Sequence, residues 1–168
     1  MVADPGQADR LSYNGALSHL SLVILEQREE SLTSFPMSCA PFEIMVSVMP
    51  GDIDEQNHVN NTVYLRWVQE VATAHWRAVA STDAQERIGW VVLRHEIDYK
   101  APACLGDDVV LRTWVGKATR LRFERFTEIR KSSDGQLFST ARTLWCPINA
   151  QTARPVRLPP EVREQFST

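Results

Sequence analysis

Apolar and polar positions along the chain follow two rhythms, one typical of strands and one of a helix. Residues 42–49, FEIMVSVM, alternate as a half-buried strand does until Pro50-Gly51 breaks the pattern. From about residue 61 to residue 80 the pattern changes to helical spacing. The apolar stripe of this segment comprises Val63, Trp67, Val71, Ala74 and Ala78. It predicts a long helix that turns one face to the core.

Four segments after the turn-rich STDAQERIG have strand character, because they are rich in β-branched and aromatic residues. They are residues 90–99, 108–118, 120–130 and 136–148. Asp134-Gly135 is a strong hairpin signal before the last of them, and PPEVREQF predicts a short helix that begins with proline. The expected order is therefore strand, long helix, four antiparallel strands and a short helix.

This order predicts an α+β fold in which a single antiparallel sheet wraps around the long helix. Such a sheet would bury the helix almost all round. That arrangement suits the helix's many apolar residues, which include Val63, Leu65, Trp67, Val68, Val71 and Ala72.

Residues 1–40 read as an N-terminal extension, and residues 41–168 as a single domain. Residues 11–33 fit an amphipathic helix. Their apolar run LSLVIL is far shorter than the ~20 residues that cross a bilayer, and it lacks the flanks of a signal peptide. In an alternative interpretation the natural start lies at Met37, and the leader is partly an artefact of the assigned start.

Charge and cysteine content narrow the function classes. The net charge of -3 and the scattering of basic among acidic residues leave no broad cationic face, which argues against a nucleic-acid partner. Three cysteines, Cys39, Cys104 and Cys146, are an odd number without CxxC spacing. They argue against a disulfide framework or a structural zinc site, so a reducing cytoplasm is expected.

The segment DIDEQNHVNN, residues 52–61, carries the candidate chemistry. It places two aspartates, a histidine and three asparagines directly before the long helix, whereas a plain helix cap needs only one short polar residue. We therefore interpret this segment as the candidate active site.

Several motifs in this chain resemble those of hotdog-fold acyl thioesterases. They are D-x-D-x-x-x-H-V-N-N-x-x-Y-L-x-W, then H-E-I-D-Y-x-x-P-A-x-x-G-D, then A-R-T-L-W ahead of R-P-V-R-L-P. More narrowly, the chain is similar over residues 41–166 to the 4-hydroxybenzoyl-CoA thioesterase family and to plant-type acyl-ACP thioesterases. The resemblance implies an antiparallel sheet around one central helix and hydrolysis of an acyl-CoA or acyl-ACP. One departure is that Gln56 stands where the plant-type enzymes usually carry asparagine, and Asn57 adjoins the histidine.

By this resemblance Asp54 is the catalytic carboxylate, either a general base toward water or the attacking nucleophile. Attack on the acyl carbonyl builds negative charge on its oxygen, and backbone N–H groups at a helix start can stabilise that charge. The amides around Asn60 and Asn61 are the expected donors. His58 could orient water, donate to the carbonyl or hydrogen-bond the loop. Asp52 is expected to be a surface or turn-capping residue outside the mechanism.

The remaining candidates would bind substrate. The short side chains of Asn60 and Asn61 would satisfy the helix end, while Tyr64 would pack or line a pocket. The phosphates of CoA or phosphopantetheine attract basic residues, and Arg94, Lys117 and Arg120 are the expected contacts. Lys100 and Arg122 belong to the same set of basic residues. No metal or separate cofactor is expected, because CoA or phosphopantetheine is part of the substrate.

Alternatives stay open at this point. A thiolate of Cys104 or Cys146 paired with His58 would be a rival nucleophile, and His95 could face the pocket or a subunit interface. The fold could instead serve a dehydratase or hydratase, or a non-catalytic acyl-ligand binding protein. The motif order favours hydrolysis. Because a lone sheet leaves open edges, a homodimer or homotetramer is expected.

Overall fold

The computed structural model describes residues 41–166, with one five-stranded antiparallel sheet packed against one long helix. The α+β class expected from the sequence is confirmed. The helix expected at residues 11–33 and the alternative start at Met37 lie outside the described residues.

The expected order of strands and helices is confirmed to within a few residues. The elements are β1 (Phe42–Ser47), the short helix η2 (Pro50–Asp52), α2 (Asn61–Val79), α3 (Thr82–Arg87), β2 (Ile88–Tyr99), β3 (Asp108–Ala118), β4 (Phe123–Lys131), β5 (Leu137–Asn149) and α4 (Pro160–Gln165). The helix α3 corrects the expectation of a turn-rich link. Ser81 caps it by accepting from the backbone N–H of Ala84 at 3.3 Å, and an ion pair joins Asp83 to Arg87 one turn later.

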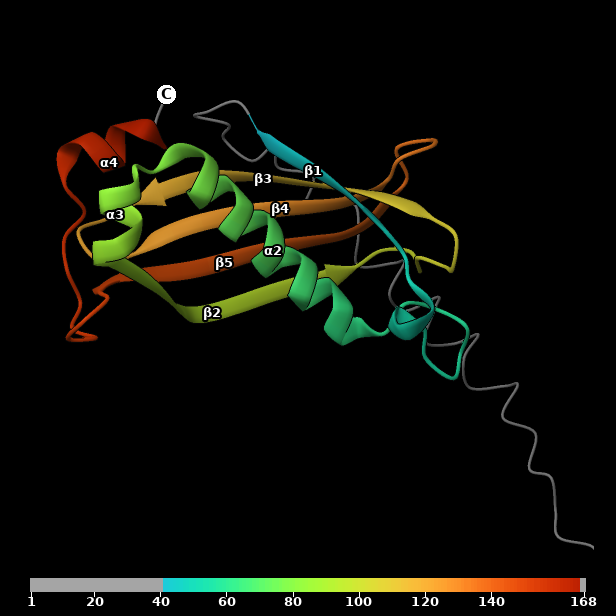
Figure 1. Cartoon of the computed structure of the whole chain (residues 1–168). Coiled ribbons are helices and arrows are strands. Elements are labelled where there is room, and N and C mark those ends of the chain that lie inside the picture. The colour runs from blue at the N-terminus through green and yellow to red at the C-terminus, as the bar shows by residue number, and fades with distance from the viewer. Residues whose placement is uncertain (1–40, 167–168) are drawn as a thin grey trace, which may run out of the picture. The chain divides into compact units, whose positions relative to one another are not determined.

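The strands lie in the order β1-β3-β4-β5-β2, so the strands on either side of α2 in the chain form the two edges of the sheet. The helix carries the chain from one edge to the other across one face of the sheet, as Figure 1 shows. The edge strand β2 contains a bulge between Val92 and Arg94 in its pairing with β5. The bulge inserts one extra residue, so the alternation of side chains changes phase there, and inward-facing residues before and after it lie on the same face of the sheet.

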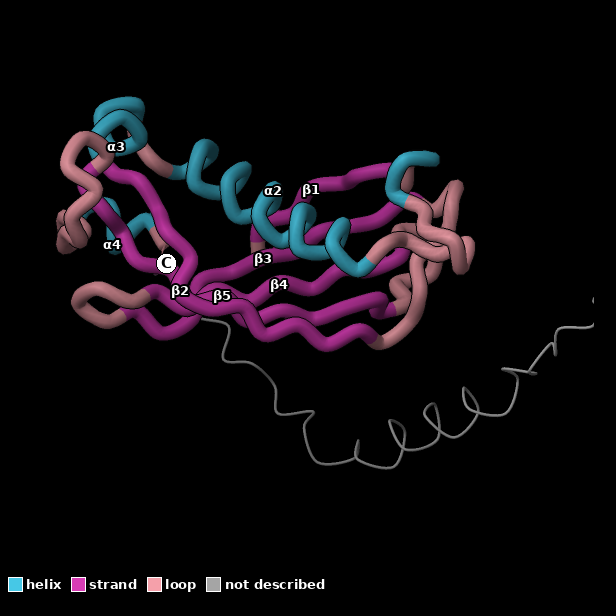
Figure 2. The backbone as a smooth tube through the Cα atoms, turned by 90° about the horizontal axis from the view of Figure 1, so that it is seen from below, coloured by secondary structure: helices cyan, strands magenta, loops and turns pink. Residues whose placement is uncertain are grey.

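The two ends of the sheet differ in what they carry. At one end Ser47 pairs with Asp108, and the chain leaves β1 for residues 52–61 and the start of α2. At the other end Ala118 pairs with Phe123, and α3 and α4 lie beside the end of α2. Figure 2 shows α2 spanning the distance between these ends on one side of the sheet. The two ends are called below the loop end and the α4 end.

One face of α2 is buried, in contrast to the expectation that the sheet would bury the helix almost all round. Its buried residues are Val63, Tyr64, Trp67, Val68, Val71, Ala72 and His75. Arg66, Gln69 and Glu70 lie on the outer face, and Leu65 is 37% exposed. The open sheet covers only the side of the helix that faces it, so the helix is amphipathic in the ordinary way.

A buried polar pair interrupts the apolar interface between α2 and the sheet. Arg125 of β4 donates from Nη1 to Nδ1 of His75 at 2.9 Å and to Oγ1 of Thr113 at 3.3 Å. The His75 ring stacks on Phe42 with centroids 4.9 Å apart. Burial, together with the charge of Arg125, lowers the pKa of His75 to about 4, and burial lowers the pKa of Arg125 to about 10. His75 is therefore neutral at pH 7 and serves as an acceptor.

We expect this pair to make the fold sensitive to mild acid. The pKa of His75 falls from 6.5 in a free side chain to about 4 in the fold, so the unfolded chain binds more protons between these values. Stability should therefore fall as pH drops from about 6.5 toward 4, by about 3 kcal/mol at most. His95, whose pKa burial also lowers, contributes with the same sign.

Urea unfolding of the wild type and of His75→Gln at a series of pH values measures this effect. Glutamine keeps an acceptor for Arg125 but does not titrate, so its free energy of unfolding should decline less over this range. Parallel curves for the two proteins would contradict the assignment.

Candidate active site

Residues 53–59 form a tight loop that is closed at its base. Ile53 and Val59 pair as an isolated bridge, and the N–H of Asp54 donates to the carbonyl of His58 at 2.9 Å. Asn57 adopts a φ of 61°, in the left-handed region that asparagine tolerates better than most residues. The loop thus places Asp54 and His58 opposite each other, directly ahead of α2.

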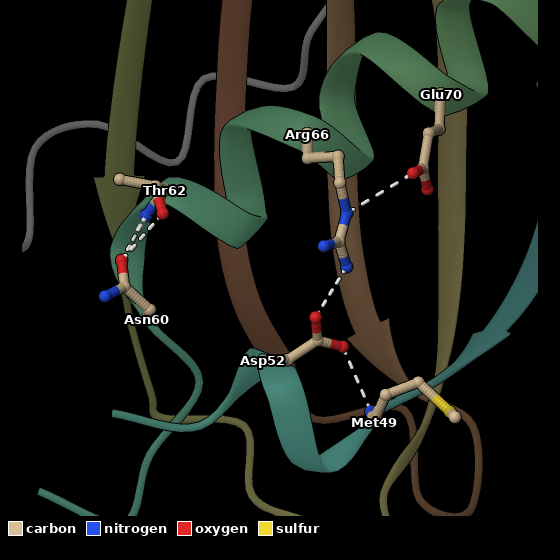
Figure 3. Close-up of polar contacts among 6 residues, drawn as sticks. All are labelled: Met49, Asp52, Asn60, Thr62, Arg66 and Glu70. Atoms are coloured by element: carbon tan, nitrogen blue, oxygen red, sulfur yellow. Dashed lines mark hydrogen bonds and ion pairs between the residues drawn. The ribbon is translucent and has the colours of Figure 1, made fainter. Parts of the chain in front are cut away.

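Asp52 anchors this loop to the helix (Figure 3). Its side chain is buried, with Oδ1 2.7 Å from Nη2 of Arg66, and Oδ2 accepts from the backbone N–H of Met49 at 3.0 Å. Its carbonyl accepts from the N–H of Asn60 at 2.8 Å. Burial raises the pKa of Asp52, but the bonds from Met49 and Arg66 outweigh burial and hold it below the usual range. The turn-capping role is confirmed, whereas the surface position is wrong.

The two carboxylate oxygens of Asp54 differ in their contacts. Oδ1 accepts from the backbone N–H groups of Gln56 at 2.8 Å and His58 at 3.4 Å. Oδ2 has no hydrogen-bond partner among residues 41–166, and the side chain is half-buried. The imidazole of exposed His58 likewise makes no hydrogen bond within that range. One oxygen therefore holds the loop, and the other is available to water or substrate.

One backbone amide at the start of α2 is free. Oδ1 of the N-cap residue Asn60 accepts from the N–H of Thr62 at 2.9 Å, and the carbonyl of Asn60 accepts from Val63. Among residues 58–63 only the N–H of Asn61 lacks an acceptor in the part of the chain that is described. Because the N–H of Asn60 is bonded to Asp52, Asn61 alone of the two expected amides can receive an oxyanion.

Two tyrosines support this helix start from the sheet side. The hydroxyl of Tyr64 accepts from the N–H of Ala103 at 3.0 Å, and burial raises its pKa. The hydroxyl of Tyr99, at the end of β2, donates to the carbonyl of Asn61 at 3.2 Å. The two rings meet edge to face at 5.3 Å. Tyr64 is only 2% exposed, so it packs beneath the loop; Tyr99, which sequence reasoning missed, lies in the motif H-E-I-D-Y.

Two of the three expected phosphate contacts lie at the opposite end of the sheet from Asp54. Exposed Arg94 pairs with Glu96 at 2.7 Å on the edge strand β2. Lys117 lies near the end of β3, and Arg120 follows in the turn to β4, so both are at the α4 end of the sheet. A single chain therefore does not bring Lys117 and Arg120 to the loop.

The two cysteines that the structure describes differ in access. Cys104 is exposed and follows Ala103, whose carbonyl accepts from the N–H of Val59 in the site loop at 2.9 Å. Cys146 is buried on β5. Cys39 lies outside the described residues. Of the described thiols, only Cys104 is adjacent in the fold to the loop that carries His58.

A cavity of about 440 Å³ lies at the α4 end, between the second half of α2 and the sheet. Its walls include Trp76, Trp90, Phe123, Arg125 and Trp145. Sequence reasoning missed it, although the alternation Phe123, Arg125, Thr127, Ile129 places Arg125 on the inner face of β4. Residues 41–166 contain neither a cluster of potential metal ligands nor a helix long and apolar enough to cross a membrane.

Comparisons with known proteins agree with this architecture. Residues 48–166 match the model of the Thioesterase-like superfamily. The DHNA-CoA thioesterase of Staphylococcus aureus superposes with a TM-score of 0.69 at 21% identity, covering 77% of this chain and 90% of that one. A structure of Slr0204, a 1,4-dihydroxy-2-naphthoyl-CoA thioesterase from Synechocystis, gives 0.66 at 21% identity, covering 76% and 96%. The expected hotdog fold is thereby confirmed.

Curated relatives act on acyl thioesters. The long-chain acyl-CoA thioesterase FadM of Escherichia coli is 24% identical over 129 residues, which are 74% of this chain and 96% of that protein. A chloroplastic palmitoyl-acyl carrier protein thioesterase of Cuphea hookeriana is 29% identical over 77 residues, 46% of this chain. The match spans only 19% of the length of that plant protein.

We expect the contact between Asp52 and Arg66 to matter for stability. Asp52→Ala should lower the free energy of unfolding by about 1–3 kcal/mol, because it removes a buried acceptor and leaves the Met49 N–H unpaired. Asp83→Ala is a matched control, since it breaks an exposed carboxylate–arginine pair with Arg87 and should cost far less. Urea denaturation measures both, and equal losses would contradict the anchoring role.

Proposed function

Because the chain belongs to the Thioesterase-like superfamily, we propose that it hydrolyses an acyl-CoA or acyl-ACP thioester to a free acid and a thiol. The observation that carries this proposal is the pairing, around one loop, of an unbonded carboxylate oxygen on Asp54 with an unbonded amide on Asn61. The names of the curated relatives support both kinds of carrier.

The proposed reaction follows from these two groups. The acyl carbonyl oxygen accepts from the N–H of Asn61, at the positive end of the α2 dipole, so negative charge on that oxygen is stabilised. Oδ2 of Asp54 takes a proton from a water molecule as its oxygen attacks the carbonyl carbon, or Oδ2 attacks that carbon itself. In the first case the proton passes from Asp54 to the departing thiolate. In the second case the carbon–sulfur bond breaks as the thiolate leaves, and water then hydrolyses the acyl-aspartate anhydride, which releases the free acid, restores the Asp54 carboxylate and supplies the proton that the thiolate takes up. His58 orients the water or the acyl group from the opposite side of the loop.

Assembly through β2 is part of the proposal. This edge strand has twelve residues, and its outer side is unpaired among residues 41–166. It exposes Val91, Val92 and Leu93 in succession. Two copies that pair β2 with β2 in antiparallel fashion would cover these residues and remove one open edge from each sheet.

A cytoplasmic location remains a prediction.

The first test ranks four substitutions by turnover of acyl-CoA substrates. Asp54→Asn keeps size but removes the negative charge, and should lower kcat by about 10²- to 10⁴-fold. His58→Ala should cost less if the imidazole only orients water or substrate. Cys104→Ala and Cys146→Ala should cost almost nothing.

Thiol release is the measurement, with hydration of crotonyl-CoA assayed in parallel to detect hydratase activity. Near-normal turnover by Asp54→Asn, or loss of turnover in Cys104→Ala, would reject the assignment of Asp54. Binding of acyl-CoA without either reaction would favour an acyl-ligand binding protein.

The second test concerns assembly. Leu93→Asp places a charge on the open side of β2 and should shift the protein toward monomer in light scattering at micromolar concentration. Met45→Asp makes the same kind of change at an exposed residue of the other edge strand, β1, and should leave the assembly intact. A monomeric wild type, or dissociation by the Met45 substitution alone, would contradict pairing through β2.

A further inference from the structure

The cavity at the α4 end contains a buried cation without a carboxylate partner. Arg125 is only 8% exposed, and its side chain lines the cavity. Both of its hydrogen bonds leave from Nη1, toward His75 and Thr113. Nε and Nη2 therefore have no partner among residues 41–166, and no Asp or Glu of that range pairs with Arg125. A buried charge left in this way is costly.

The nearest acidic neighbour in the sequence does not neutralise this cation. Glu124 also lines the cavity, but its carboxylate is bonded to Arg142 of β5. On the other side His75 is an acceptor without charge. The guanidinium therefore keeps an unmatched positive charge at the inner wall of the cavity.

The rest of the wall is apolar. Trp76, Trp90, Phe123 and Trp145 supply broad hydrophobic faces. The indole N–H groups of Trp90 and Trp145 are shielded from solvent and make no hydrogen bond among the described residues, so these rings present carbon atoms to the cavity. A volume of about 440 Å³ lies within the range of small-molecule sites. These features suit a ligand with an apolar body and an anionic oxygen group at one end.

We propose that this cavity receives the acyl group of the substrate, and that Arg125 binds a carboxylate at the far end of that group. The inference rests on the proposed thioesterase function and names its substrate class, the thioesters of dicarboxylic acids. Nε and Nη2 form the fork that holds a carboxylate by two parallel hydrogen bonds. The carboxylate supplies the counter-charge that the described residues do not.

The position of the cavity implies that two copies of the chain build each site. Asn61 and His75, which contacts Arg125, are 75 − 61 = 14 residues apart on α2, or about 21 Å at 1.5 Å per residue. In the dimer proposed above, antiparallel β2 strands bring the α4 end of one copy beside the loop end of the other. The acyl group bound at Asp54 of one copy thus enters the cavity of its partner.

Selectivity between two acyl-CoAs of equal length tests the role of Arg125. The wild type should hydrolyse suberoyl-CoA, whose chain ends in a carboxylate, with kcat/KM about 10- to 100-fold above that for octanoyl-CoA. Arg125→Leu should abolish this preference; because the preference is a ratio of two substrates on the same protein, a general loss of stability from the unpaired His75 and Thr113 does not produce that result. Arg130→Leu, on the outer face of the same strand, should keep the preference. An unchanged preference in Arg125→Leu would overturn the proposal.

Binding can be followed without turnover. The three cavity tryptophans should report ligand entry by a change in fluorescence when Asp54→Asn is titrated with suberoyl-CoA. Adding Arg125→Leu to this variant should weaken binding by about 10- to 100-fold, and adding Arg125→Lys by less, because lysine keeps the charge. This readout does not depend on hydrolysis. Failure of the catalytic assignment therefore leaves the carboxylate site testable, whereas equal affinity in all three variants would overturn it.

Mixed dimers test the two-chain arrangement. Exchange of subunits between Asp54→Asn and Arg125→Leu creates one site with both native side chains, if Asp54 and Arg125 act across the interface. Suberoyl-CoA turnover should then rise well above that of either parent. If both groups act within one chain, no native site forms, and an absence of recovery after verified exchange would overturn the two-chain arrangement.

Discussion

Asp52 joins three pieces of chain that would otherwise be independent. Its carboxylate accepts from the N–H of Met49, just after β1, and pairs with Arg66 on α2. Its backbone carbonyl accepts from the N–H of Asn60 at the helix start. A buried carboxylate requires such partners, because its desolvation is costly. The position of the neighbouring Asp54, two residues later, is thereby set relative to the first turn of α2. The loop geometry depends on a residue that takes no part in the proposed chemistry.

The interface between α2 and the sheet combines apolar packing with a few buried polar side chains. Most of the interface with α2 is apolar, but Arg125, His75 and Thr113 form a hydrogen-bonded group within it. Replacing such groups by apolar residues of similar volume is often neutral or stabilising. Their presence is therefore poorly explained by stability alone. Because these polar side chains are costly to bury, they are candidates for contact with a ligand.

Periodicity was sufficient to predict β1, α2 and the four later strands, because each has a clear alternation or stripe. It missed α3, whose six residues, TDAQER, are too polar and too few to show a stripe. The pairing of β2 with β5 could not be read locally, since strand order depends on contacts distant in sequence. The segment containing Asp54 and Asn61 was visible as a motif. The choice of Asn61 over Asn60 as the free amide was not, because it depends on which acceptor each N–H finds in three dimensions.

The bulge in β2 determines which face of the sheet each later side chain of that strand points to. Val92 lies opposite Trp145 and Arg94 opposite Leu144, so Leu93 is the extra residue that keeps His95 and Tyr99 on the inner face. If β2 kept all twelve residues but paired without a bulge, the six positions after Leu93 would be inverted, and the hydroxyl of Tyr99 would leave the carbonyl of Asn61. The start of α2 is thus coupled to the residue count of a distant strand. Removal of Leu93 itself would give a regular ladder with both halves of β2 facing as they do now, whereas a one-residue change that leaves the bulge in place would turn part of the strand over, whatever the chemical nature of that residue.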